Sequence, residues 1–183
     1  AVKKPVFPFN KFPNQKVFLS PEMKSTGEVI GFDRNLGSAY AKSELGAGNK
    51  IPKTGCIFIS VNDIDKPNIL KIARDISEMN FSLIATDGTA QLLAQNGIQC
   101  ETIFKVGEGR PHIVDAIKNK KIHFIINTPL GAQSRYDEYE IGKAAIKHKI
   151  PMATTISGAE AALRGMRIMK HGKLHYSSLQ EIF

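Results

Sequence analysis

The chain has 183 residues, of which 42% are hydrophobic and 23% are charged, and such a chain can bury a core without disulfides or a structural metal. No apolar run approaches the roughly 18 residues that a membrane-spanning helix needs, and residues 1–13 (AVKKPVFPFNKFP) lack the charged-then-apolar order of a signal peptide. We therefore expect a soluble, cytoplasmic protein that has no membrane partner.

The formal net charge of +8 raises the question of nucleic-acid binding. The lysines are scattered, however, and no aromatic residues alternate with a basic run. This pattern argues against a nucleic-acid partner and is compatible with small anionic ligands. Cys56 and Cys100 stand in apolar, strand-like sequence without metal-ligand spacing, so we expect two reduced, buried thiols.

Residues 1–30 differ from the rest of the chain. Four prolines and several phenylalanines stand there without a helical or an alternating period. An apolar, irregular segment of this kind needs another surface to cover it. It predicts that the chain belongs to, or docks onto, a larger body.

From residue 35 onward, strand and helix patterns alternate. A short helix is predicted over residues 35–45, and a Gly-Ala-Gly break ends it. The apolar runs that follow predict strands over residues 56–61, 82–86, 100–105, 123–128 and 151–155. Helical patterns lie between and after them, near residues 66–79, 88–96, 111–119, 135–148 and 157–169. The alternation predicts a three-layer α/β/α fold whose parallel sheet is covered by helices on both faces.

Polar residues follow several of these strands, at the edge of the sheet where α/β proteins bind ligands. The strand over residues 82–86 runs into Thr86, Gly88 and Thr89, and a helix that begins there offers free N–H groups to an anion. Three further sets lie at the same edge: Lys66 after the first strand, Lys105 at the end of the third, and Asn127 with Thr128 at the end of the fourth. Their convergence predicts a pocket for a phosphorylated ligand. Taken singly, the threonines could cap the helix and Lys66 could be an ordinary surface lysine.

Catalytic and metal-binding patterns are weak. Glu108, Arg110 and His112 could form an acid/base cluster, but they stand at a helix start where they could also bind an anion or pack between loops. The acidic residues Asp137, Glu138 and Glu140 read as the solvated start of a helix. No P-loop, dinucleotide-binding fingerprint, nucleophile elbow or metal-ligand spacing is present.

Four short runs give the chain a family resemblance. Residues 25–29 (STGEV), 85–90 (ATDGTA), 105–113 (KVGEGRPHI) and 125–128 (IINT) resemble, in order and spacing, the C-terminal part of the carbamoyl-phosphate synthetase large subunit. The resemblance covers nearly the whole chain, and the first and third runs are specific to that family.

The resemblance implies a Rossmann-like, methylglyoxal-synthase-like fold with a five-stranded parallel sheet over residues 31–183, which serves as an allosteric domain. Residues 1–30 would be the tail of the preceding ATP-grasp domain. The domain would bind a nucleoside monophosphate such as UMP or IMP. Its phosphate would contact Lys66, Thr86, Gly88 and Thr89, and its nucleoside would contact Lys105, Asn127 and Thr128.

The resemblance also implies a parent enzyme. That enzyme would be an ATP-dependent, glutamine-hydrolysing ligase that makes carbamoyl phosphate for arginine and pyrimidine biosynthesis, with ATP and Mg or Mn in its other domains. The domain itself would hold no cofactor or metal and would not be catalytic. Its partners would be the rest of the large subunit, the glutaminase small subunit and further copies in a homo-oligomer.

Two departures bear on the effector. Pro129 replaces a threonine of the nucleotide-binding relatives, and Met152 replaces a tyrosine that helps to hold ornithine at the domain junction in some of them, although Thr154 keeps its hydroxyl. Two other functions stay open beside the effector role. One is a standalone methylglyoxal synthase-type lyase, which would need a carboxylate base where this chain has residues 109–112 (GRPH). The other is an oligomerisation or interface module without a ligand.

Overall fold

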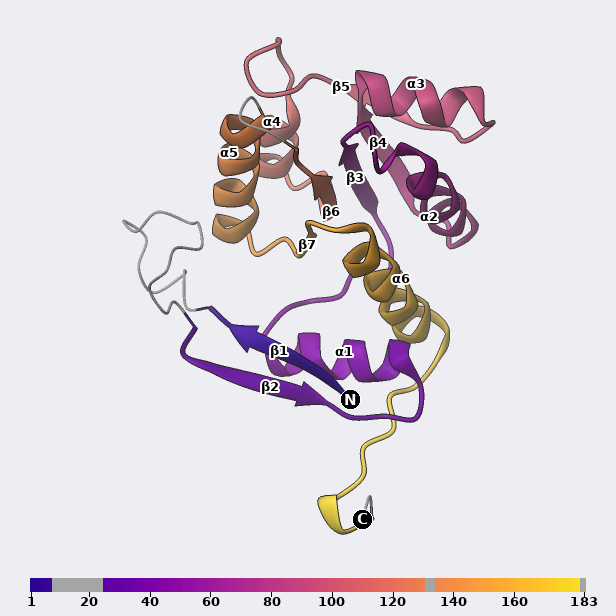
Figure 1. The fold of residues 1–183 in the computed structure, drawn as a ribbon, viewed down its shortest axis with the longest axis vertical. Coiled ribbons are helices and arrows are strands. Elements are labelled where there is room, and N and C mark those ends of the chain that lie inside the picture. The colour runs from indigo at the N-terminus through magenta and orange to yellow at the C-terminus, as the bar shows by residue number, and fades with distance from the viewer. Residues whose placement is uncertain (8–24, 131–133, 182–183) are drawn as a thin grey trace.

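A five-stranded parallel sheet forms the centre of the computed structural model, which describes residues 1–7, 25–130 and 134–181 (Figure 1). The strand order is β5-β4-β3-β6-β7, and every neighbouring pair is parallel. The strands span Cys56–Val61 (β3), Ser82–Thr86 (β4), Glu101–Ile103 (β5), Ile122–Thr128 (β6) and Met152–Ala153 (β7). The predicted three-layer α/β fold with a five-stranded parallel sheet is therefore confirmed.

Helices cover both faces of this sheet. One apolar cluster joins inward side chains of β3 and β6 to α2 (Lys66–Glu78), α3 (Asp87–Gln95) and α6 (Ile156–His171). A second cluster joins the opposite side chains of the same strands to α4 (Ile113–Lys118) and α5 (Ser134–Lys147). Successive residues of a strand point to opposite faces, so Ile57 belongs to the first cluster and Phe58 to the second, and both are fully buried. Figure 1 shows α4 and α5 on one side of the strands and α2, α3 and α6 on the other.

Turn residues fix the ends of these elements. Pro67 stands in the first turn of α2, where the missing N–H is tolerated. Asn80 and Gly97 have positive φ angles of 56° and 72° just after α2 and α3, the conformation in which many helices end. Because β3, β4 and β6 are parallel, their carboxyl ends lie at one edge of the sheet. The first turns of α2 and α3 lie beside that edge.

A further layer precedes the sheet. Strands β1 (Val2–Val6) and β2 (Gly27–Gly31) form an antiparallel pair, and α1 (Leu36–Gly46) packs between this pair and α6 (Figure 1). The Lys4 ammonium pairs with the buried Glu44 carboxylate, which also accepts a hydrogen bond of 2.7 Å from the Asn49 amide. Charged and polar contacts therefore join β1 to α1 and to the chain that follows it.

The interpretation of residues 1–30 as irregular is wrong at its two ends, where β1 and most of β2 form. That another body covers this segment stays a prediction. The prolines and phenylalanines of residues 8–24 lie outside the described ranges. The predicted domain boundary at residue 30 falls inside β2, and the division into two domains stays a prediction. None of the helices within the described ranges reaches both the length and the hydropathy of a membrane span. Cys56 is buried and Cys100 is half-buried, and both are free thiols.

Candidate functional site

A cavity of about 480 Å³ lies at the carboxyl edge of the sheet. It is bounded by the ends of β3, β4 and β6 and by residues of α2, α3, α4 and α5. Seven of the eight predicted site residues line it: Lys66, Thr86, Gly88, Thr89, Lys105, Asn127 and Thr128. Thr154, predicted at a domain junction, is exposed between β7 and α6 and does not line this cavity.

The first turn of α3 presents backbone N–H groups to this cavity. Thr86 occupies the N-cap position, but its side chain makes no capping hydrogen bond; the hydroxyl donates to the Ser60 Oγ at 3.3 Å instead. The Thr89 hydroxyl accepts from the Val61 N–H at 3.5 Å. The alternative that Thr86 serves as a capping device is therefore wrong. The first turn of a helix carries unpaired N–H groups and a partial positive charge, and here no N-cap side chain occupies them.

Two lysines bring positive charge to the same place. Lys66 is the first residue of α2, and a Cβ atom at Gly88 would lie 3.7 Å from its Nζ. The same Nζ lies 2.6 Å from the Oδ1 of Asp63, whose side chain is 91% exposed. Lys105 Nζ lies 3.8 Å from Glu108 Oε1. Both lysines are thus held by carboxylates of exposed or half-exposed residues, and an anion could replace those carboxylates at little cost because exposed ion pairs are weak.

The end of β6 contributes a buried amide and a hydroxyl. Asn127 is 6% exposed, and within the described residues its side chain makes no hydrogen bond. Thr128 is held by Asn62, whose Nδ2 donates to the Thr128 carbonyl at 3.0 Å and whose Oδ1 accepts from the Ile64 N–H at 2.9 Å. Asn62 therefore ties the loop after β3 to the end of β6, while Asn127 keeps its hydrogen-bonding capacity for the cavity.

Two carboxylates of α5 also line the cavity, and here the sequence prediction was wrong. Asp137 and Glu138 were expected on the solvated start of a helix, but both are half-buried and face this space. Burial raises the pKa of the Asp137 carboxyl, the nearby Lys105 opposes the rise and Glu108 adds to it. The cavity therefore offers hydrogen-bond acceptors as well as cationic groups.

Glu108, Arg110 and His112 do not line the cavity. The loop that holds them is organised by Asp115 of α4, whose Oδ2 accepts from the His112 N–H at 3.2 Å and whose Oδ1 lies 3.5 Å from the Arg110 Nη1. The His112 hydrogen bond is the main cause that lowers the pKa of the Asp115 carboxyl. These residues stabilise the loop and do not form an acid/base cluster in the cavity. Within the described ranges no three His, Cys, Asp or Glu side chains gather in a way that could hold a metal ion.

Sequence reasoning missed Ser60, Asn62, Asp137 and Glu138. Ser60 lies near the end of the apolar run at β3 and Asn62 directly follows it, and polar residues at the end of a parallel strand are candidates for a ligand site. No comparable signal exists for Asp137 and Glu138, because the face that α5 turns toward the cavity depends on how the helix packs.

Comparison with known proteins gives a consistent result. A family model described as the MGS-like domain matches residues 68–154. The carbamoyl phosphate synthase large chain of Nostoc sp. is 46% identical over 181 residues, which are 99% of this chain and 16% of that protein. The large chain of Archaeoglobus fulgidus is 48% identical over 99% of this chain and 17% of its own length.

Shorter relatives match as well. The protein of Methanopyrus kandleri named as the C-terminal section of the large chain is 47% identical over 100% of this chain and 34% of its own length. The present chain thus spans a sixth to a third of the relatives it matches. Over its whole length it is similar to part of the carbamoyl phosphate synthase large chain, and its residues 68–154 match the MGS-like domain.

Proposed function

We propose that this chain is the effector-binding region of a carbamoyl phosphate synthase large chain, and that its cavity binds a nucleoside monophosphate such as UMP or IMP. One observation carries the proposal. The nearly buried Asn127 amide, which has no hydrogen-bond partner in the described part of the chain, faces the same cavity as the uncapped first turn of α3 and Lys66. This amide therefore reaches the cavity with its donors and its acceptor unused, and a ligand there would supply their partners.

The phosphate would bind at the first turn of α3. The N–H groups of Gly88 and Thr89 would donate to its oxygens, and Lys66 would leave the exposed Asp63 to neutralise its charge. Thr86 and Thr89 are both buried and line the cavity. The Thr89 hydroxyl accepts from Val61 and keeps its O–H as a further donor, whereas the Thr86 hydroxyl would have to release Ser60 in order to donate.

The nucleoside would extend toward β6 and α5. Asn127 and Thr128 offer donors and acceptors, Lys105 offers a second ammonium, and the Asp137 carboxylate can accept from the hydroxyls of a sugar. A carboxylate in the cavity would repel a bare phosphate, so its presence favours a ligand that combines a phosphate with hydroxyl groups. Pro129 also lines the cavity and offers no hydroxyl to the base.

Calorimetric titration of the chain with UMP, IMP and inorganic phosphate tests this proposal. We expect Lys66→Ala to weaken the binding of UMP or IMP at least about tenfold, because a charge-assisted contact to phosphate contributes about 1.5 kcal/mol or more. Lys53→Ala is the matched control, since Lys53 is exposed and does not line the cavity. If none of the three compounds binds at millimolar concentration, the proposal fails and an interface module without a ligand is the better account.

A lyase that acts on a phosphate ester is a second candidate, and Asp137 is the observation that favours it. Asp137 lines the same cavity as Lys66 and Lys105, and a carboxylate with a raised pKa at such a place is a candidate general base. Release of methylglyoxal from dihydroxyacetone phosphate by the chain, abolished by Asp137→Asn, would establish this activity. The absence of release together with UMP or IMP binding would support the effector role.

The remaining parts of the proposal concern the parent protein. The ATP and divalent cations of the reaction, the glutaminase small subunit and the contacts of a homo-oligomer would all involve the rest of the large chain. The effector would act on that remainder by binding one conformation of the whole subunit more tightly than another.

A further inference from the structure

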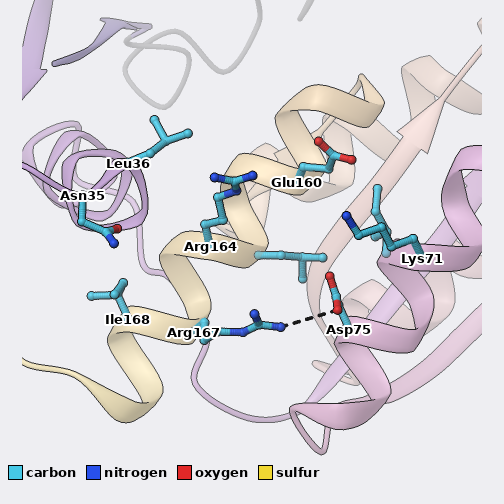
Figure 2. A pocket seen from close by; sticks show the side chains of 10 residues that line it. Asn35, Leu36, Lys71, Asp75, Glu160, Arg164, Arg167 and Ile168 are labelled. Atoms are coloured by element: carbon cyan, nitrogen blue, oxygen red, sulfur yellow. Dashed lines mark ion pairs between the residues drawn. The ribbon is translucent and has the colours of Figure 1, made fainter.

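A second cavity of about 440 Å³ lies where α1, α2 and α6 meet, away from the carboxyl edge of the sheet (Figure 2). Asn35 and Leu36 from the start of α1 border it, and the other lining residues come from α2 and α6. They are Lys71, Ile72 and Asp75 of α2 and Glu160, Leu163, Arg164, Arg167 and Ile168 of α6. No residue is shared with the cavity at the carboxyl edge.

Three cationic side chains border this cavity from two helices. Figure 2 shows Lys71 on one side and Arg164 and Arg167 on the other. Within the described residues, Lys71 and Arg164 make no hydrogen bond or ion pair. Arg167 pairs with Asp75 at 3.5 Å, and its side chain is 55% exposed, so most of its N–H groups remain available. An arginine has five donors in a planar fork that matches a carboxylate or phosphate group.

The opposing charges are fewer. Arg167 neutralises Asp75, which leaves Glu160 as the unpaired carboxylate of the lining. Glu160 stands one turn before Arg164 on α6, and such i,i+4 pairs interact by less than about 0.5 kcal/mol. Within the described residues, the lining therefore has two cations without a partner, Lys71 and Arg164, and one carboxylate without a partner, Glu160. Arg167 adds N–H groups that Asp75 does not use, so the excess of positive charge favours an anionic ligand.

The walls of this cavity are fixed without a ligand. Ile72 and Leu163 are buried and belong to the main apolar cluster. A Cβ atom at Gly37 would lie 2.7 Å from the Arg164 carbonyl oxygen, so α1 and α6 are in close backbone contact. The Asn35 Oδ1 accepts from the Gly37 N–H at 2.8 Å and from the Ser38 N–H, which orients its amide group as a further donor at the rim. Rigid walls reduce the entropy lost on binding.

From this arrangement we propose that the cavity between α1, α2 and α6 is a second anion site, which takes a compact dianion through Lys71, Arg164 and Arg167. A phosphate ester carries its two charges on one tetrahedral group, and a small dicarboxylate carries one charge on each of two planar groups. The donors of Lys71, Arg164 and Arg167 match both arrangements. The volume suits a small molecule of this class. The proposal does not depend on the function proposed for the cavity at the carboxyl edge.

Backbone amide NMR of the chain, titrated separately with inorganic phosphate and with succinate, tests the proposal. We expect shifts of amides in residues 35–38 and 160–168 with at least one of the two anions, in addition to any phosphate-induced shifts at residues 87–89. The Lys71→Gln/Arg164→Gln double variant should weaken binding at the first set about tenfold or more. Both residues are exposed, so these changes leave the core intact.

Two further variants separate this site from the other cavity. Arg74→Gln, an exposed change of the same kind on α2 that does not line the cavity, should leave the shifts unchanged. Lys66→Ala should affect only the shifts at residues 87–89. Shifts with phosphate alone would identify a phosphate ester as the ligand class, and shifts with succinate alone would identify a dicarboxylate. The proposal is overturned if neither anion shifts residues 35–38 and 160–168, or if the double variant retains the shifts.

Discussion

The carboxylates at the carboxyl-edge cavity differ in whether a neighbouring lysine or burial sets their pKa. Lys66 and Lys105 are paired with Asp63 and Glu108, which lie outside the apolar core. Lys66 also lowers the pKa of the Asp63 carboxyl, chiefly through their hydrogen bond. Asp137 behaves in the opposite way, because burial disfavours its ionised form. An anion that enters the cavity can therefore displace Asp63 from Lys66. Asp137 has no such exchange, and its carboxylate would face the bound anion.

This contrast gives a pH prediction for Asp137→Asn. The substitution removes a negative charge, so it should tighten inorganic phosphate at neutral pH, and it should weaken UMP or IMP if the carboxylate accepts from sugar hydroxyls. Wild-type Asp137 becomes protonated as the pH falls through its raised pKa. The difference in phosphate affinity between the two proteins should therefore be full above that pKa and shrink below it.

Parallel calorimetric titrations of both proteins, each from neutral to mildly acidic pH, measure this difference. The titration of phosphate itself is common to both proteins and cancels in the ratio of their affinities. A ratio that stays constant across the range would show that Asp137 does not face the bound anion.

At the scale of elements, β2 and α1 approach each other through a glycine. A Cβ atom at Gly31 would fall 1.9 Å from the Ala39 carbonyl oxygen and 2.6 Å from the Ser43 nitrogen. Neither atom can move without shifting the α1 backbone. We expect Gly31→Ala to lower the free energy of unfolding by about 2 kcal/mol or more, because the added atom overpacks a backbone contact.

Gly27 provides a control in the same strand, since a Cβ atom there would meet nothing within 4 Å. Gly27→Ala should change the free energy of unfolding by no more than about 0.5 kcal/mol. Urea denaturation of the two variants and the unmodified chain gives both values. Equal stabilities of the two variants would mean that β2 does not pack on α1 at Gly31.

The same layer marks the limit of sequence reasoning about elements. The strands β3 and β4 were predicted with their correct bounds, because a continuous apolar run between turn residues is typical of a buried parallel strand. The pairing of β1 with β2 was not predicted. Its two strands are separated by about 20 residues, β1 contains Pro5, and β2 begins and ends with glycine. Such strands form through a distant partner rather than through a local pattern.

The candidate site divides in the same way. Lys66, Thr86 and Asn127 were predictable because the carboxyl ends of parallel strands must meet at one edge. Asp137 was not, since α5 could have turned another face toward that edge. The cavity between α1, α2 and α6 could not be predicted either. It arises where three helices that are distant in sequence come together, and no local pattern in any one of them marks it.

The whole molecule spans 16% of the length of relatives such as the Nostoc large chain. In an enzyme that contains the complete large chain, we expect Asn127→Leu to remove the response of carbamoyl phosphate synthesis to UMP or IMP. Leucine has the same branching as asparagine, and Asn127 borders a cavity that leaves room for the larger methyl groups. Because Asn127 makes no hydrogen bond in the described part of the chain, the variant should remain folded.

Rates of carbamoyl phosphate formation over a range of effector concentrations measure this response. The Lys53→Ala enzyme should respond like the unmodified one, because Lys53 lies outside the cavity. An Asn127→Leu enzyme with an unchanged response would contradict the proposed effector site, whereas urea unfolding of the same variant would reveal any loss of structure.

Helix α2 touches both cavities. Its first residue, Lys66, lines the cavity at the carboxyl edge, and Lys71 and Asp75 line the cavity between α1, α2 and α6. Lys66 and Lys71 are separated by about 7.5 Å along the helix axis, and both belong to one continuous helix of 13 residues. If a ligand at one cavity displaces α2, thermodynamic linkage requires that each ligand change the affinity of the other by the same factor. One helix would then convert two separate binding equilibria into a single coupled one.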